Sequence, residues 1–259
     1  MHLFWQIGQY LQYFFLKEDR HSVHSPFVFN WYVKLFSFLK ENKKGDHAIE
    51  AKRALFRQSS KKIKVFDLGA GSKFSQGPFR TLSSLVKYSC SPLKFSLLYQ
   101  YLCQLTPAVN VLELGTSLGL NTAYLYQVTK GKLYTLEACP NLSRMAMENF
   151  GTGSDIEFVK GDIADKLPAI LEEINQIDFV LMDANHRYGP TKFYFEMMRP
   201  FLHEESIVVV SDIHWSPEMK AIWMELKGLP EISLSVDLFE CGILFLKNLG
   251  PKAHYILKY

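Results

Sequence analysis

A glycine-containing turn in the middle of the chain has the residue types of a ligand-binding loop. It runs from Glu113 to Gly119 in the sequence ELGTSLG. Gly115 lets the backbone come close to a ligand, and Gly119 permits a tight approach, because glycine has no Cβ atom. Ser117 stands where a dinucleotide-binding fingerprint, G-x-G-x-x-G, has its second glycine. The spacing therefore argues against a pyrophosphate ligand and disfavours a nicotinamide-dependent oxidoreductase.

Acidic residues end or follow the next three apolar segments of the chain. Glu137 lies 22 residues after Gly115, where a carboxylate can accept hydrogen bonds from both hydroxyls of a ribose. Asp162 and Asp183 follow the next two segments. A nucleoside and a dinucleotide would both use such a carboxylate at the second segment. Each acid also has a structural interpretation, because an acid at the end of a strand often caps the following helix.

These residues must be positioned by strands and helices, which alternate regularly after residue 109. Apolar, strand-like segments are predicted at 111–114, 132–137, 156–160, 177–183, 207–212, 233–238 and 242–246. Helices are predicted between them at 122–129, 142–150, 163–174, 191–202 and 218–227. Five apolar strands, each followed by a helix, predict a Rossmann-like, doubly wound α/β fold with a mostly parallel sheet. The last two strands have no full helix between them, so the last strand should pair antiparallel.

The chain is predicted to have three parts. Residues 1–60 form an N-terminal helical cap with apolar and aromatic residues at helical spacing, and residues 61–108 form a bridging segment with helices. Residues 109–259 form the core, whose carboxyl strand ends should carry the ligand site. The bridging segment holds a second glycine-rich turn, Asp67–Ser72. We interpret this turn as a lid or a packing turn, because no acid-terminated strand follows it at the right distance.

The turn and the acids over residues 110–247 resemble a class I S-adenosylmethionine-dependent methyltransferase. In that family the glycine turn faces the methionine part of the cofactor. The acid after the second strand binds the ribose, and the acid after the third strand binds the adenine amine. The resemblance gives these two roles to Glu137 and Asp162. It implies the following cofactor-binding residues: Glu113, Gly115, Thr116, Ser117, Gly119, Glu137, Asp162 and Asp183.

The sequence DANHRY, which begins at Asp183, resembles the D-x-x-H-x-Y motif of small-molecule O-methyltransferases, including bacterial members of the superfamily. The histidine is the expected base in that group. The resemblance therefore implies that His186 removes a proton from a substrate hydroxyl, with Asp183 as the second catalytic residue. A histidine whose pKa lies near neutral pH suits this step. The alternative is that His186 caps a helix or packs in a loop.

Asp183 and Asp212 are candidate ligands of a divalent metal such as magnesium. In the metal-dependent, catechol-type branch, an Asp-Asn pair after the fifth strand joins the fourth-strand aspartate in holding magnesium through oxygen atoms. Here the pair is Asp212-Ile213, so one oxygen ligand is missing. Alternatively, Asp183 orients His186 or the cofactor, and Asp212 caps the helix that contains Trp215.

Composition limits the function classes further. The net charge of +3 is small and spread along the chain, so no nucleic-acid partner is expected. The four cysteines form no CxxC pair; this excludes an obvious zinc or disulfide framework and favours a cytoplasmic location. The apolar segment 1–16 is too short and too polar to span a bilayer, and a membrane partner is not expected. Its aromatic residues are predicted to cover a pocket, to lie in a homodimer interface or to lie on a membrane surface.

These observations predict an S-adenosylmethionine-dependent methyltransferase that methylates a hydroxyl of a small molecule, with His186 as general base. The alternative is a binding or regulatory protein that keeps the methyltransferase fold without turnover. Ile213 would fit the second possibility, because its apolar side chain stands where a metal-binding member has an oxygen ligand, as if a metal site had been lost. The identity of the acceptor stays open at this stage.

Overall fold

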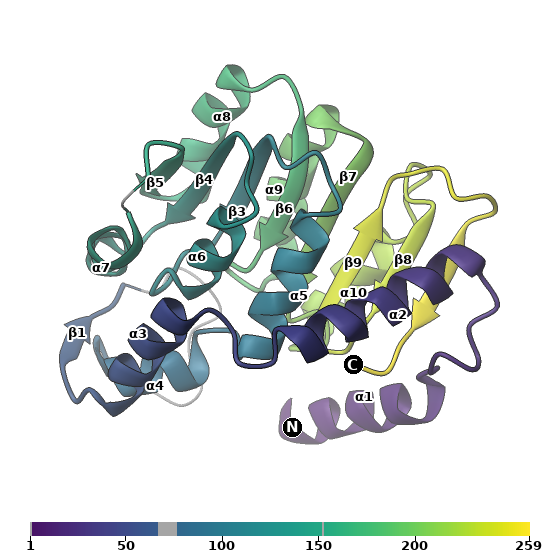
Figure 1. The fold of residues 1–259 in the computed structure, drawn as a ribbon, viewed down its shortest axis with the longest axis horizontal. Helices are drawn as coiled ribbons and strands as arrows, with labels where there is room; N and C mark the ends of the chain where they lie inside the picture. The colour runs from purple at the N-terminus through teal and green to yellow at the C-terminus, as the bar shows by residue number, and fades with distance from the viewer. Residues whose placement is uncertain (1, 67–76, 152) are drawn as a thin grey trace.

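The computed structural model describes residues 2–66, 77–151 and 153–259. An eight-stranded sheet with the order β10-β8-β9-β7-β6-β3-β4-β5 forms its centre (Figure 1). Its strands are β3 (Asn110–Leu114), β4 (Lys132–Glu137), β5 (Ile156–Lys160), β6 (Ile177–Met182), β7 (Leu202–Ser211), β8 (Leu234–Asp237), β9 (Cys241–Phe245) and β10 (Ala253–Ile256). The intervening helices are α6 (Leu120–Tyr126), α7 (Pro140–Phe150), α8 (Ile163–Glu173), α9 (Tyr188–Met198) and α10 (Pro217–Leu226). This alternation confirms the predicted α/β fold.

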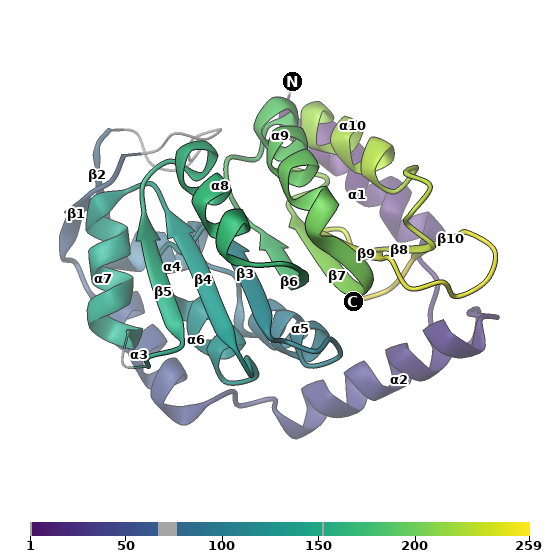
Figure 2. The same ribbon diagram turned by 90° about the horizontal axis from the view of Figure 1, so that it is seen from above.

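Helices cover both faces of the sheet (Figure 2). On one face, Leu112 and Leu114 of β3 pack in a cluster with side chains of α8, α9 and α10. On the other face, Val111 of the same strand packs in a cluster that includes Leu98 and Leu102. Successive side chains of a strand point to opposite faces, so a strand covered on both sides is mostly apolar. The continuous apolar runs in the sequence follow from this burial.

Strand pairing agrees with the predicted topology and extends it. Strands β3 to β7 pair in parallel, whereas β9 runs antiparallel to both β7 and β8. The predicted antiparallel pairing of β8 with β9 is therefore confirmed. An additional strand, β10, pairs in parallel with β8. Its sequence, AHYI, is too short and too mixed to show strand periodicity.

Three helices, α1 (His2–Leu16), α2 (Pro26–Glu41) and α3 (His47–Gln58), form the N-terminal part of the molecule. Helix α2 has Pro26 in its first turn, and the Ser25 hydroxyl accepts a hydrogen bond from the amide of Val28. Its inner face adds Trp31 and Leu35 to the core. Most apolar side chains described for α1 are exposed. Over the residues that the structure describes, no helix is long and apolar enough to cross a membrane.

The segment between the N-terminal helices and β3 contains a separate two-stranded sheet of β1 (Lys62–Lys64) and β2 (Phe79–Thr81). Two helices follow, α4 (Leu82–Tyr88) and α5 (Leu93–Cys103). Helix α5 is buried along most of its length and packs against the sheet. The Asp67–Ser72 turn lies outside the described residues.

Candidate active site

The carboxyl ends of four neighbouring strands meet at one edge of the sheet. Leu114 of β3 pairs with Leu136 of β4 and with Met182 of β6. Met182 in turn pairs with Val210 of β7. The residues that follow these positions, including the glycine turn, are therefore neighbours in space. This edge is where ligands bind in an open α/β sheet.

The turn after β3 requires glycine at its first position. Gly115 has a φ of +105°, and a Cβ atom placed there would lie 2.2 Å from the main-chain oxygen of Asp183. An L side chain would therefore be strained and would collide with the neighbouring strand end. Gly119 has a φ of +80°, and its Cβ would lie 2.9 Å from the ring of Phe150 on α7. Both glycines thus let the backbone of the turn pack tightly against neighbouring elements.

Glu137 lies beside this turn. One of its carboxylate oxygens accepts a hydrogen bond of 2.8 Å from the Ser117 amide, and the other accepts one of 2.8 Å from the Cys139 amide. Ser117 has a φ of +49°, a conformation that costs energy for a residue other than glycine. The carboxylate therefore holds the turn in place at the end of β4.

Glu113 lies beneath the turn and is fully buried. Its Oε2 atom accepts hydrogen bonds from the hydroxyls of Thr122, at 2.5 Å, and Thr135, at 2.6 Å. Burial raises the pKa of Glu113 from 4.5 to about 8, because a charged carboxylate is poorly solvated there. The hydroxyl of Thr116 lies 2.5 Å from that of Thr135. Glu113 and Thr116 thus support the turn through buried contacts with α6 and β4.

Asp162 is the N-cap of α8: its Oδ1 atom accepts a hydrogen bond of 2.8 Å from the Ala164 amide. The structural interpretation of this acid is therefore correct for one of its oxygens. Burial raises the pKa of Tyr194, and the charge of Asp162 adds to the increase. The amide of Asn185 donates a hydrogen bond of 3.3 Å to the Tyr194 hydroxyl. The Oδ1 atom of Asn185 is buried and has no hydrogen-bond partner among the described residues.

The sequence patterns did not single out Asn185 or Tyr194. Asn185 lies inside the DANHRY motif but carries no charge. Tyr194 lies on α9, where a buried aromatic side chain is common and does not by itself indicate a binding site. A buried polar atom without a hydrogen-bond partner calls for an explanation, such as strain, a functional role or a bound water or ion. Only the folded arrangement shows that these two side chains extend the polar surface around Asp162.

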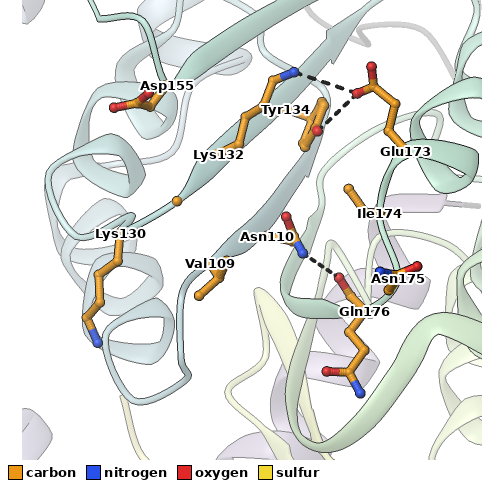
Figure 3. A pocket seen from close by; sticks show the side chains of 11 residues that line it. Val109, Asn110, Lys130, Lys132, Tyr134, Asp155, Glu173, Ile174, Asn175 and Gln176 are labelled. Carbon is orange, nitrogen blue, oxygen red and sulfur yellow. Dashed lines mark hydrogen bonds and ion pairs between the residues drawn. The ribbon is translucent and has the colours of Figure 1, made fainter.

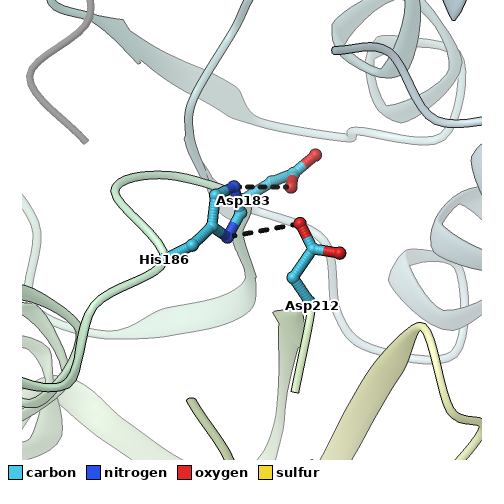
Figure 4. A group of neighbouring side chains, drawn as sticks. All are labelled: Asp183, His186 and Asp212. Carbon is cyan, nitrogen blue, oxygen red and sulfur yellow. Dashed lines mark ion pairs between the residues drawn. The ribbon is translucent and has the colours of Figure 1, made fainter. Parts of the chain in front are cut away.

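His186 lies between two carboxylates from different strand ends (Figure 4). Its Nε2 atom is 3.9 Å from Oδ1 of Asp183, and its Nδ1 atom is 3.5 Å from Oδ2 of Asp212. Burial raises the pKa of Asp183 from 3.8 to about 6; the Asp212 charge adds to this increase, and the His186 charge opposes it. The side chains of all three residues are between 20% and 33% exposed. The structure thus brings together the three residues named from the sequence: His186 and Asp183 as catalytic candidates, and Asp183 and Asp212 as metal-ligand candidates.

The backbone around these residues is strained. Asn185 and His186 have φ values of +67° and +48°, and Asp212 has a φ of +58°. Residues other than glycine adopt such conformations at an energetic cost and do so preferentially at functional sites.

The suggestion that Asp212 caps a helix is wrong, because the hydroxyl of Ser216 is the N-cap of α10. Asp212 is therefore not needed to begin that helix.

The same three side chains could hold a metal ion, since one ligand atom from each lies within 4.8 Å of the others. Ile213 is fully buried in the cluster against α8, α9 and α10, so it contributes to packing. The set consists of two carboxylates and one imidazole. Magnesium prefers oxygen ligands in an octahedral arrangement, whereas imidazole suits transition metals such as zinc, iron or copper. The residues therefore fit a mixed nitrogen and oxygen site better than the predicted magnesium site.

A hollow of about 570 Å³ lies at the opposite edge of the sheet (Figure 3). It is lined by residues at the amino ends of β3 and β4, including Asn110 and Lys132. Lys132 forms ion pairs with Glu157 and Glu173 across this region. Because ligands of doubly wound sheets bind at the carboxyl ends of the strands, this hollow is not the candidate active site.

Comparisons with known proteins identify the class of domain. Residues 112–213 match the family model of a methyltransferase domain. The chain is 30% identical over 120 residues to a catechol O-methyltransferase of Niastella koreensis, which covers 44% of this chain and 53% of that protein. It is 32% identical over 154 residues to a protein-L-isoaspartate O-methyltransferase of Pyrococcus horikoshii, which covers 59% of this chain and 60% of that protein. The matches thus span about half to three-fifths of the length of these curated relatives.

A solved structure shows the same fold. The O-methyltransferase from Bacillus cereus, in complex with S-adenosylhomocysteine, matches with a TM-score of 0.56 and 16% identity. The match covers 82% of this chain and 99% of that one. Residues 112–213 thus match a methyltransferase domain, and the chain has the fold of this O-methyltransferase.

Proposed function

We propose that the chain transfers a methyl group from S-adenosylmethionine to a hydroxyl oxygen of a small molecule, and that His186 accepts the hydroxyl proton. The observation that carries this proposal is the position of His186 between the carboxylates of Asp183 and Asp212, at the strand ends beside the Gly115 turn. Two carboxylates stabilise the positively charged imidazolium that forms when His186 takes up a proton.

The residues around the turn fit an adenosine-containing cofactor. The backbone at Gly115 and Ser117 would face the methionine part, Glu137 the ribose and Asp162 the adenine amine. Glu137 already accepts two main-chain hydrogen bonds, so its role toward a ribose requires its remaining lone pairs. The unpartnered Oδ1 atom of Asn185 supports a further polar contact. The other turn residues, Glu113, Thr116 and Gly119, would act by holding the turn in shape.

The cofactor, when bound, supplies a methyl group on a positively charged sulfur. Attack by a neutral hydroxyl is slow, so the acceptor oxygen must lose its proton as the new bond forms. The two curated relatives are named for oxygen methylation, one of a catechol and one of an isoaspartyl residue. A carboxylate acceptor is already anionic and needs no base. The presence of His186 between Asp183 and Asp212 therefore favours a hydroxyl acceptor.

A metal bound to Asp183, Asp212 and His186 would supply a positive charge that favours a deprotonated acceptor. In that case His186 would be a ligand and could not accept the proton through the same nitrogen. Turnover after chelation separates these roles. We expect the protein to keep its activity in EDTA; loss of activity that manganese restores would refute the assignment of His186 as base.

The proposal is tested by cofactor binding and by turnover. Thermal shifts with S-adenosylmethionine, S-adenosylhomocysteine and NAD should show stabilisation by the first two only. Production of S-adenosylhomocysteine should then be measured against a panel of phenols and catechols. A chain that binds cofactor and turns over none of the acceptors would support the alternative of a binding or regulatory protein.

His186→Gln is the decisive variant. We expect turnover to fall by about 100-fold or more, the contribution typical of a general base, while the cofactor-induced thermal shift is kept. His203→Gln is a matched control, because the Nε2 atom of His203 lies 3.0 Å from Asp178 in a His–Asp pair away from the site. Full activity of His186→Gln, or an equal loss in His203→Gln, would contradict the proposal.

A further inference from the structure

Two buried hydroxyl groups lie next to the candidate active site. Tyr99 is on α5, and its hydroxyl oxygen is 3.3 Å from the Oγ atom of Ser211. Ser211 is the last residue of β7 and directly precedes Asp212. Tyr99 and Ser211 are only 3% and 5% exposed. Because both side chains are buried, any effect on the reaction must pass through a neighbouring residue.

The pairing of the strands places Ser211 beside Asp183. Met182 of β6 pairs in parallel with Val210 of β7, so the next residues along the two strands, Asp183 and Ser211, are neighbours. Burial raises the pKa of Asp183, and a hydrogen bond with the Ser211 side chain opposes this increase. The Oδ1 atom of Asp183 is 3.9 Å from Nε2 of His186. Ser211 is therefore one hydrogen bond away from the Asp183–His186 pair.

The hydrogen bonds of these groups have a defined direction. A serine hydroxyl has one proton, and an ionised carboxylate only accepts. The Ser211 proton therefore goes to Asp183, and the bond between Ser211 and Tyr99 needs the tyrosine proton. Burial raises the pKa of Tyr99 well above its usual value of 10, so this proton is present at neutral pH. The Cys241 thiol also lies beside the Tyr99 hydroxyl, but sulfur is a weak acceptor.

The Tyr99 hydroxyl also has a hydrogen bond with the Ser91 side chain. The Nδ2 atom of Asn121, on α6, donates a hydrogen bond of 3.0 Å to Oγ of Ser91, which leaves the Ser91 proton for Tyr99. The Oδ1 atom of Asn121 accepts one of 2.7 Å from the Ser96 hydroxyl, and this contact fixes the orientation of the amide. The resulting series of hydrogen bonds, here called the Tyr99 chain, consists of the side chains of Asn121, Ser91, Tyr99, Ser211 and Asp183. Each donor in such a series polarises the next one and strengthens its bond.

We propose that Tyr99 and Ser211 are positioning residues that hold the Asp183 carboxylate beside His186. This role rests on the proposed function, in which Asp183 stabilises the protonated His186. A carboxylate without a donor could rotate its oxygen atoms away from the imidazole, whereas a fixed one stabilises the new charge without reorganisation. Tyr99 lies outside residues 112–213, which match the methyltransferase domain. Helix α5 would therefore contribute to the site as well as to the core.

The first test is the NMR signal of the His186 ring, which requires no turnover. In protein with isotope-labelled histidine, this signal is the one that is absent from His186→Gln. At one fixed pH, we expect it to shift in Tyr99→Phe and in Ser211→Ala. Tyr101→Phe is the matched control, because Tyr101 is a buried tyrosine on the same helix, and its hydroxyl donates a hydrogen bond of 3.5 Å to the main-chain oxygen of Trp31. This variant should leave the signal in place.

The second test is turnover of an acceptor that the unmodified chain methylates. Tyr99→Phe should lower kcat about fivefold, the effect of one hydrogen bond between neutral groups. Ser211→Ala should lower it about tenfold or more, because its bond is to a charged group. The KM for S-adenosylmethionine should change less than about twofold in both variants. The double variant should be no slower than Ser211→Ala, because the two residues act through one series of bonds. Tyr101→Phe should keep the unmodified kcat.

Three results would overturn the proposal. The first is an unchanged His186 signal in both Tyr99→Phe and Ser211→Ala. The second is an unchanged kcat in these two variants, and the third is a double variant whose loss is the product of the two single losses. A chain that methylates no acceptor would refute the proposed function, whereas the His186 signal would still decide whether Tyr99 and Ser211 hold Asp183. Each substitution removes a single oxygen atom, and an unchanged melting temperature would show that the variant is folded.

Discussion

Replacing Glu113 by glutamine should remove a pH dependence of stability that burial of this carboxyl group creates. In the folded protein the pKa of Glu113 is raised from 4.5 to about 8. Between these values the folded state holds a proton that the unfolded chain has released. The free energy of unfolding therefore falls as the pH rises, because the unfolded state binds fewer protons.

The size of this effect follows from the two pKa values. Between pH 6 and pH 8, the Glu113 carboxyl alone should lower the free energy of unfolding by about 2 kcal/mol. The pKa of Asp183 is raised from 3.8 to about 6, so its contribution in the same direction falls mainly below pH 6. Glutamine cannot ionise, and it is close to glutamate in shape. Glu113→Gln should therefore retain less than half of the decrease.

The measurement is urea unfolding without cofactor at pH 6, 7 and 8. Glu157→Gln is a suitable control, because Glu157 has a side chain that is 45% exposed and pairs with Lys132 at 2.6 Å. This variant should show the full decrease. The reasoning is refuted if the unmodified chain is equally stable at all three pH values, or if Glu113→Gln keeps the full decrease.

Further predictions concern the turn, the neighbouring polar surface and the opposite edge of the sheet. Gly115→Ala should destabilise the protein by about 2–4 kcal/mol and remove the thermal shift with S-adenosylhomocysteine, because its Cβ would lie 2.2 Å from a main-chain oxygen; a normal shift would contradict this. Asn185→Leu should weaken S-adenosylhomocysteine binding measured by calorimetry about tenfold, the loss of one hydrogen bond, and unchanged affinity would exclude Asn185 from the cofactor site. Asp178→Ala should lower the free energy of unfolding by about 2–4 kcal/mol, because the Oδ2 atom of Asp178 accepts hydrogen bonds of 2.7 and 2.8 Å from the main-chain amides of Val109 and Asn110. Cofactor affinity should not change. Denaturant unfolding checks the first part and calorimetry the second.

Most of the α/β core was predictable from local patterns. The strands β4 and β5 have the predicted bounds, 132–137 and 156–160. The central part of β4 is buried, and a strand covered on both faces is mostly apolar. The positions of Glu137, Asp162 and Asp183 at strand ends also follow from the order of the segments along the chain. Parallel strands bring those ends to one edge of the sheet, so a shared site could be inferred without coordinates.

Strand β10 and the neighbours of Asp162 could not be predicted in this way. The four residues of β10 are a strand because β8 offers them an open edge, which is a property of the folded sheet. Asn185 and Tyr194 come together through the strained loop after β6 and the start of α9. Such contacts depend on the path of a loop, and periodicity carries no information about that path.

By itself, the sequence determined the class of fold, the glycine turn and the set of acids at the strand ends, because burial and backbone sterics act on each segment locally. Only the tertiary structure decided which structural role each of these groups has. It buries Glu113 beneath the turn, uses one oxygen of Asp162 as a helix cap, and places His186 between Asp183 and Asp212. It also turns the apolar side of α1 outward, because the side that carries Gln6, Gln9 and Tyr13 finds hydrogen-bond partners on the core. These outcomes depend on contacts between segments far apart in the chain, which no local pattern specifies.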